Sequence, residues 1–176
     1  CFREETMRYR RTRVPGGSWF FTVVTRDRIP VFRKPVMTAL LRHALRRVRR
    51  RLPFTIDAIV VLPDHLHCIW TLPAGDADYS TRWRLIKSFV TRHGKNALDH
   101  HSASLWQHRY WEHHIRNHDD YRAHVDYIHY NPVKHGYVDR PVNWPYSSLG
   151  QYINQGVYPY DWGSGGITQS ERVGRE

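Results

Sequence analysis

The sequence contains little cysteine, few acidic side chains and no long hydrophobic run. Only Cys1 and Cys68 among its 176 residues are cysteines, too few for a disulfide-stabilised scaffold, so we expect a reducing compartment. No run of 18 apolar residues occurs, and no membrane-spanning helix is expected. The first residues lack the apolar core of a secretory signal. These absences together predict a cytoplasmic protein.

Basic charge is what the sequence has in excess. Lys and Arg number 27 against 16 Asp and Glu, a formal net charge of +11. Residues 1–51 carry 15 basic and 3 acidic side chains, net +12, whereas the remaining 125 carry 12 and 13, net −1. Aromatic residues make up 14% of the chain, which argues against disorder. A folded basic chain indicates a polyanionic partner, most often nucleic acid, the alternative being a basic surface that binds nothing.

The hydrophobic pattern predicts one domain over residues 1–176, with a basic arm over 1–13 and a flexible tail over 163–176. Period-two and period-3.6 patterns predict the following elements in order: strand 19–25, helix 36–52, strand 54–62, strand 65–72, helix 81–93, a strand within 105–116, a helix from 117 to about 130 that Pro132 stops, and a short helix near 147–155. This order is the βαββαβ pattern of an α+β ferredoxin-like sandwich with an antiparallel sheet and an additional helix. Two helices would cover one face of the sheet, leaving the other face for the third helix or a ligand.

The first candidate site is the tripeptide His65-Leu66-His67. Residues i and i+2 of a strand point the same way, so both imidazoles would lie on one face and Leu66 on the other. Two imidazoles on a rigid strand suit a divalent metal. With 13 histidines in the chain, two unrelated histidines remain the alternative.

The second candidate site is the helix end that contains Tyr127 and Asn131. These residues are four apart and therefore on one helical face. The phenol can act as a nucleophile and the amide oxygen as a hard metal ligand. The alternative is that Tyr127 packs in the core and Asn131 caps the helix before Pro132. His124 lies one turn earlier and is a weaker candidate for the same site.

The two features together fit phosphodiester chemistry. A metal held by two histidines and an amide keeps open positions for phosphate oxygens. A tyrosine on the adjacent helix can then attack phosphorus, which gives a covalent phosphotyrosine and a free hydroxyl. An ordinary phenol has a pKa near 10, so positive charge, for example from Lys134, would have to stabilise its phenolate. Two other functions stay open: a non-catalytic protein that binds hairpin DNA or RNA, and a phosphodiesterase that hydrolyses with water.

The chain resembles the REP-associated tyrosine transposases, which are relatives of the single-tyrosine, H-hydrophobic-H transposases of insertion sequences. The resemblance covers roughly residues 9–162. The matching stretches are Tyr9-Arg10-Arg11, Pro15-Gly16-Gly17 through Val23, Val61 through Trp70, Arg82-Trp83-Arg84 with Ile86-Lys87, Trp111-Glu112-His113 with Ile115-Arg116-Asn117, and Asp126-Tyr127-Ile128 through Asn131-Pro132-Val133-Lys134-His135-Gly136.

The resemblance implies a ferredoxin-like nuclease core that uses Mg²⁺ or Mn²⁺. It implies Tyr127 as the catalytic residue and His65, His67 and Asn131 as metal ligands. It further implies a bacterial, nucleoid-associated protein that cuts and rejoins single-stranded DNA near the foot of REP-type hairpins. A monomer is expected, with a dimer as the alternative. Because imidazole suits manganese better than magnesium, we expect Mn²⁺ to support activity at least as well as Mg²⁺.

The expected DNA-binding surface has three parts. Arginines of the N-terminal arm would follow phosphates, while the start of the helix over 81–93 would add cations and a stacking tryptophan. Lys134 would act near the cleavage site. The expected contact residues are Arg8, Arg10, Arg11, Arg13, Arg82, Trp83, Arg84, Lys87 and Lys134. For the arm the alternative is a solvated tail, and for Trp83 it is a place in the core.

Overall fold

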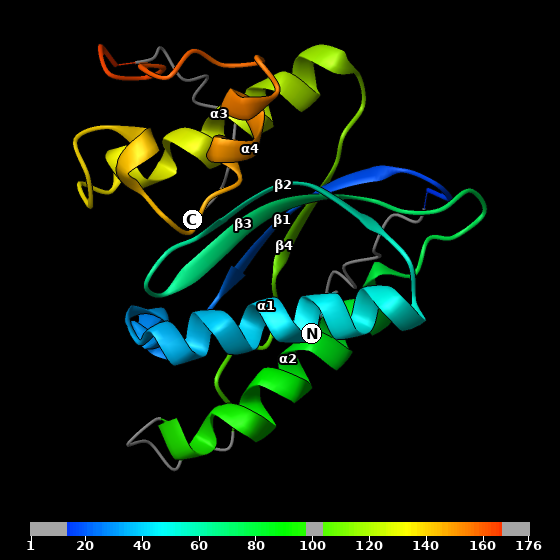
Figure 1. The fold of residues 1–176 in the computed structure, drawn as a ribbon. Helices are drawn as coiled ribbons and strands as arrows, with labels where there is room; N and C mark the ends of the chain where they lie inside the picture. The colour runs from blue at the N-terminus through cyan, green and yellow to red at the C-terminus, as the bar shows by residue number, and fades with distance from the viewer. Residues whose placement is uncertain (1–13, 98–103, 167–176) are drawn as a thin grey trace, which may run out of the picture.

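A computed structural model describes residues 14–97 and 104–166 of the chain. Its main elements follow the predicted order (Figure 1). They are β1 (Ser18–Val24), α1 (Pro35–Arg51), β2 (Thr55–Val61), β3 (His65–Thr71), α2 (Tyr79–Gly94), β4 (Trp111–His114), α3 (His118–Lys134) and α4 (Leu149–Asn154). The predicted βαββαβ order with an additional helix is therefore confirmed. No helix among the described residues is both long and apolar enough to cross a membrane.

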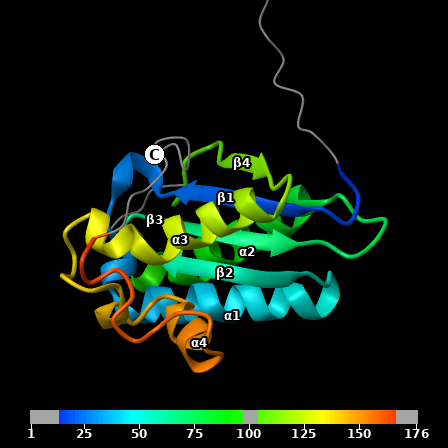
Figure 2. The same ribbon diagram turned by 90° about the horizontal axis from the view of Figure 1, so that it is seen from above.

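The four strands form one antiparallel sheet in the order β2-β3-β1-β4. Helices α1 and α2 cover one face, whereas α3 and α4 lie on the other (Figure 1). Seen from above, α3 runs over the sheet on the side opposite α1 and α2 (Figure 2). The sheet is thus enclosed between two helical layers, and any group on the α3 face lies between the sheet and α3.

Alternation along the central strands separates the two hydrophobic layers. Phe21 of β1 and Trp70 of β3 point toward α1 and α2, where the Trp70 ring stacks on Trp83 at 4.2 Å. Phe20 and Ile69 point the opposite way and pack beneath Ile128 of α3. This period-two pattern is the reason that a polar side chain on the α3 face stays apart from the larger core.

Helix α3 ends later than the sequence predicts. Pro132 was expected to stop the helix near residue 130, but the helix continues through it to Lys134, so that prediction is wrong. A proline this close to the end removes only one internal hydrogen bond. Gly136 ends the helix instead, because its positive φ of 69° lets the chain turn while the Tyr137 amide donates to the Pro132 carbonyl. The extension keeps Asn131 inside the helix.

Candidate active site

His65 and His67 lie side by side on the α3 face of β3. Their ring centroids are 5.0 Å apart, and both side chains are completely buried. Leu66 points into the opposite layer, among the residues that pack against α1 and α2. The expected arrangement, with both imidazoles on one face, is therefore present. Their position on a central strand gives both rings a rigid support.

One ring nitrogen of each histidine already has a hydrogen-bond partner. Nδ1 of His65 lies 2.6 Å from Oδ1 of Asp64, and Nδ1 of His67 lies 2.9 Å from Oγ1 of Thr22. Burial alone would raise the pKa of Asp64, but hydrogen bonds and charge from His65 and Arg28 outweigh it and hold that pKa below its ordinary value. The carboxylate is thus ionised and orients the imidazole.

Tyr127 and Asn131 approach this pair from α3. The Tyr127 ring lies 5.1 Å from the His67 ring, and Asn131 follows one helical turn later on the same buried face. Nζ of Lys134 donates to the Tyr127 hydroxyl at 3.4 Å and lies 4.9 Å from the centre of its ring. An ammonium group therefore lies beside the oxygen on which negative charge would develop. Tyr127 is only 2% exposed, so its side chain is covered in this structure.

The Asn131 side chain has the properties of a metal ligand. It is completely buried, and neither its amide nitrogen nor its oxygen has a hydrogen-bond partner within the part of the chain that the structure describes. Burying such an amide unsatisfied costs on the order of 1–3 kcal/mol. Since two buried imidazoles and one amide oxygen form a donor set for a divalent metal, these residues fit the expected ion.

Comparisons with known proteins identify the family of this chain. The family model described as "Transposase IS200 like" matches residues 18–131. A REP-associated tyrosine transposase of Escherichia coli strain K12 is 49% identical over 166 residues, which cover 91% of this chain and 92% of that protein. The chain belongs to the REP-associated tyrosine transposases. A relative from Haemophilus influenzae is 39% identical over 163 residues, 88% of this chain and 92% of its own.

A solved structure extends the comparison to the whole fold. It is a REP-associated tyrosine transposase bound to a REP hairpin, 47% identical, and the match covers 97% of this chain and 99% of that one with a TM-score of 0.84. The ferredoxin-like α+β fold of the transposase is therefore confirmed.

Sequence reasoning did not assign three neighbours of the histidine pair. Asp64 directly precedes His65 in the chain, so the sequence itself contains a signal for its role. Thr22 lies opposite His67 in the register of β1 with β3, and His135 places its ring 5.1 Å from that of His65. Neither can be identified without knowing the strand pairing and the end of α3.

Two of the expected DNA contacts of the transposase are buried instead. Arg82 is 1% exposed and its guanidinium donates to the carbonyls of Pro53 and Asp78 and to Asp76. Trp83 is completely buried against Trp70. Both assignments to DNA are therefore wrong in this structure, because neither side chain reaches the surface. The arginines expected in the N-terminal arm, Arg8, Arg10, Arg11 and Arg13, lie outside the described residues.

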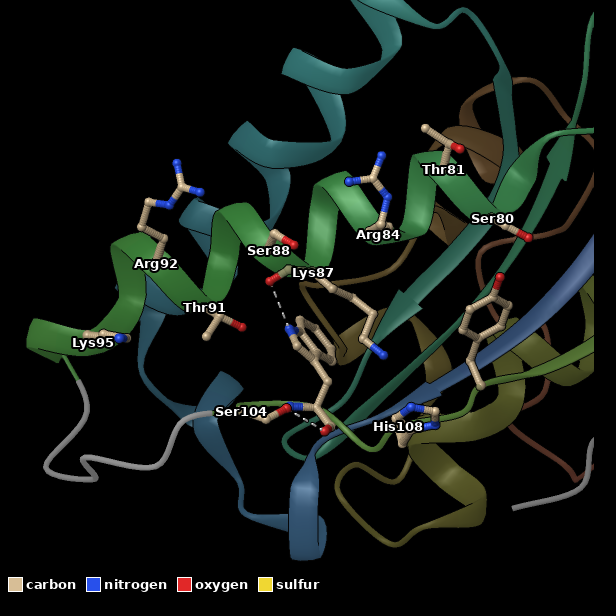
Figure 3. A pocket seen from close by; sticks show the side chains of 12 residues that line it. Ser80, Thr81, Arg84, Lys87, Ser88, Thr91, Arg92, Lys95, Ser104 and His108 are labelled. Carbon is tan, nitrogen blue, oxygen red and sulfur yellow. Dashed lines mark hydrogen bonds between the residues drawn. The ribbon is translucent and has the colours of Figure 1, made fainter.

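The other two expected contacts on α2 line an open groove of about 660 Å³ between α2 and residues 104–110 (Figure 3). Lys87 extends from α2 across the groove and donates to the Gln107 carbonyl at 2.8 Å, while Arg84 projects from the helix. The cations along this groove are Arg84, Lys87, Arg92 and Lys95, and hydroxyl groups of Ser80, Thr81, Ser88 and Thr91 lie between them. Of the residues described as lining it, none is acidic.

Proposed function

We propose that this chain is a metal-dependent single-stranded DNA endonuclease and strand transferase that acts on REP-type hairpins through a 5′-phosphotyrosine intermediate. The observation that carries the proposal is the contact of the Tyr127 ring with His67 of the histidine pair, with Asn131 one turn further along α3. A protein that only binds hairpins has no need of a buried nucleophile, two imidazoles and an amide in one place. The names of the relatives, which refer to REP sequences and a REP hairpin, support the choice of substrate.

The reaction is a transesterification at phosphorus. The Tyr127 oxygen forms a bond to the phosphorus of a phosphodiester, and the bond from that phosphorus to the 3′ oxygen breaks. The phenol loses its proton and the leaving 3′ oxygen gains one, so the products are a 5′-phosphotyrosine and a free 3′ hydroxyl. Because bond energy is conserved, attack by a 3′ hydroxyl on the intermediate rejoins a strand and restores Tyr127.

The surrounding residues prepare this step. Lys134 places positive charge beside the Tyr127 oxygen, which favours the phenolate. His65, His67 and Asn131 would hold a divalent metal, Mg²⁺ or Mn²⁺, which when bound polarises the phosphodiester. Asp64 and Thr22 fix the orientation of the two imidazoles.

The groove along α2 supplies a path for the strand that leads to the site. Trp106 bridges to Thr25, and the Gln107 amide donates to the Val24 carbonyl, so the groove ends beside the last residues of β1. Val24 lies opposite His65 in the sheet. A strand whose phosphates follow the cations of α2 lies on the α1–α2 face, and it would pass around the end of β1 to reach the histidine pair on the α3 face.

A covalent trapping experiment tests the function. The protein is incubated with labelled single-stranded hairpin DNA and Mn²⁺, denatured, and analysed for a protein–DNA adduct. We expect an adduct with the wild type and none with Tyr127→Phe, which removes only the nucleophilic oxygen. DNA binding by Tyr127→Phe should stay within a few-fold of the wild type.

Tyr130→Phe is the matched control, since it removes a phenol oxygen from the same helix outside the buried site. It should form the adduct as the wild type does. Cut DNA without any adduct would show hydrolysis by water, and bound but intact DNA would show a binding protein. An adduct that persists in Tyr127→Phe would move the nucleophile to another tyrosine, with Tyr121 and Tyr130 as the next candidates.

A further inference from the structure

A second group of metal-ligating side chains lies on the α3 face, where β4 meets the first turns of α3. His113 comes from β4, and Asp120 and His124 come from α3. One ligand atom from each lies within 4.8 Å of the other two. His124 is buried, whereas His113 and Asp120 are partly exposed. The group is thus open to solvent on one side and anchored in the core on the other.

The distances within this group match a coordination shell. Oδ1 of Asp120 lies 3.2 Å from Nε2 of His113 and 3.1 Å from Nδ1 of His124. Donor atoms around a tetrahedral zinc ion, at bond lengths of about 2.0–2.1 Å, are separated by about 3.3 Å. The other carboxylate oxygen, Oδ2, accepts a hydrogen bond from the Arg116 amide at 2.9 Å. That bond holds the carboxylate in place. Oδ2 also lies 2.9 Å from Nε2 of His113, so both carboxylate oxygens face the imidazoles.

This group is separate from the histidine pair of the active site. His67 lies on β3 and His113 on β4, and β1 runs between these two strands. Neighbouring strands are about 4.8 Å apart, so strands on either side of β1 are about 10 Å apart. The Phe20 ring of β1 contacts His67 at 5.6 Å and His124 at 4.7 Å, which places an aromatic side chain between the two groups.

Burial and hydrogen bonds shift the pKa values of two of these side chains. Burial lowers the pKa of His124 despite its hydrogen bonding to Asp120, so the imidazole is neutral near pH 7. Burial by itself raises the pKa of Asp120, but the Arg116 amide, His113 and His124 outweigh it and keep that pKa low. In the metal-free state Nδ1 of His124 lies 2.8 Å from the carbonyl oxygen of Asp120, to which it donates. A cation bound at Nδ1 would displace that proton, which moves to Nε2 of the same neutral ring.

We infer that His113, Asp120 and His124 form a second divalent-metal site that takes Zn²⁺, with Co²⁺ as its spectroscopic substitute. Two imidazoles and one carboxylate favour such borderline cations over Mg²⁺. The ion would join β4 to the beginning of the helix that carries Tyr127, and solvent would complete its coordination. Its role is to fix α3 on the sheet, since none of its ligands contacts the Tyr127 oxygen.

Metal counting on the full chain tests the inference. Each variant is dialysed against Zn²⁺ and its bound metal is measured by elemental analysis. His113→Gln and Asp120→Asn should each bind one equivalent less than the wild type, and Asp120→Asn keeps an oxygen for the Arg116 amide. His118→Gln is the control, because His118 is an exposed histidine of the same helix outside the group, and it should lose nothing.

The double variant His65→Gln/His67→Gln distinguishes the two centres. It should lose one equivalent and still give the intense visible absorption of four-coordinate Co²⁺, which adding His113→Gln should abolish. Unchanged zinc in both His113→Gln and Asp120→Asn would overturn the second site and leave the first intact. If His65→Gln/His67→Gln binds as many equivalents of zinc as the wild type, that result would contradict only the proposed metal of the active site. If His113→Gln fails to fold, Asp120→Asn and the Co²⁺ spectrum of the double variant decide the question.

Discussion

At the scale of single residues, the hydrogen-bond partner of one ring nitrogen distinguishes a candidate metal ligand in this chain from a core histidine. Nδ1 of His65 lies 2.6 Å from Oδ1 of Asp64, an ionised carboxylate. His129 is also buried on α3, but its Nε2 lies 2.8 Å from Oγ of Ser148 and burial lowers its pKa to about 3. His129 is thus a neutral core residue, whereas His65 has the carboxylate support that metal-binding histidines commonly have.

The contact between Asp64 and His65 leads to a prediction for a single substitution. Asp64→Asn keeps the size of the side chain but removes the charge that orients and polarises His65. We expect the affinity for Mn²⁺ at the histidine pair to fall by about 10- to 100-fold. Titration of His113→Gln with Mn²⁺, followed by calorimetry, measures this affinity without a contribution from the second group.

Asp27→Asn is the matched control, because Asp27 is an exposed aspartate in the turn after β1. It should leave the Mn²⁺ affinity unchanged. Equal affinities for Asp64→Asn and the unsubstituted background would show that the carboxylate does not support the metal ligand.

At the scale of elements, the sequence predicts the direction of side chains best where one hydrophobic period dominates a strand or helix. The alternation of β3 is sufficient to place His65 and His67 on one face, and the helical spacing places Tyr127 and Asn131 together. The end of α3 was missed because Pro132 is normally a stop signal, and only the turn at Gly136 shows where the helix ends. Helix α2 ends at Gly94, one residue beyond the predicted range; a Cβ there would come within 2.7 Å of the Met37 side chain, so glycine allows α1 and α2 to pack closely.

Helix α2 shows why a basic residue cannot be assigned from its type alone. Arg82 and Arg84 are two residues apart and therefore point in different directions. Arg82 points inward and satisfies the carbonyls at the end of the α1–β2 connection, whereas Arg84 is exposed at the groove. The sequence does not distinguish them, because the inward face of α2 is defined by contacts with residues 52 and 53.

This difference predicts opposite effects for two similar substitutions. Arg82→Met leaves buried carbonyls and Asp76 without their donor, and we expect the free energy of unfolding to fall by about 3 kcal/mol. Arg84→Met should change it by less than about 0.5 kcal/mol but weaken binding to single-stranded DNA. Urea denaturation and a DNA-binding titration at one salt concentration measure the two effects. Similar stability losses for both variants would contradict the structural role of Arg82.

At the scale of the whole molecule, the charge and the chemistry occupy different parts of the chain. Residues 1–51 hold the excess of basic charge, whereas His65, His67, Tyr127 and Asn131 lie in the nearly neutral remainder. The arginines of α1 are exposed on one side of the molecule. The groove of α2 adds a second basic surface within residues 52–176, a part of the chain whose net charge is −1. We therefore expect the local arrangement of cations, and not the total charge, to decide where a strand binds.

The final prediction separates local from total charge. Neutralising three groove cations in Arg84→Gln/Arg92→Gln/Lys95→Gln removes three phosphate contacts. For a single strand, each contact adds about 0.7 to the slope of log affinity against log salt concentration, so the slope should fall by about 2. The rate of adduct formation at saturating DNA should stay the same, because none of the three residues lies at Tyr127.

The variant Arg46→Gln/Arg50→Gln/Arg51→Gln removes the same charge from the exposed surface of α1 and serves as the control. With a hairpin-free oligonucleotide as ligand, the α1 variant should keep most of the wild-type slope, because the groove of α2 guides the unpaired strand. Equal losses of slope in the two triple variants would mean that the net charge attracts the strand and that the groove does not direct it.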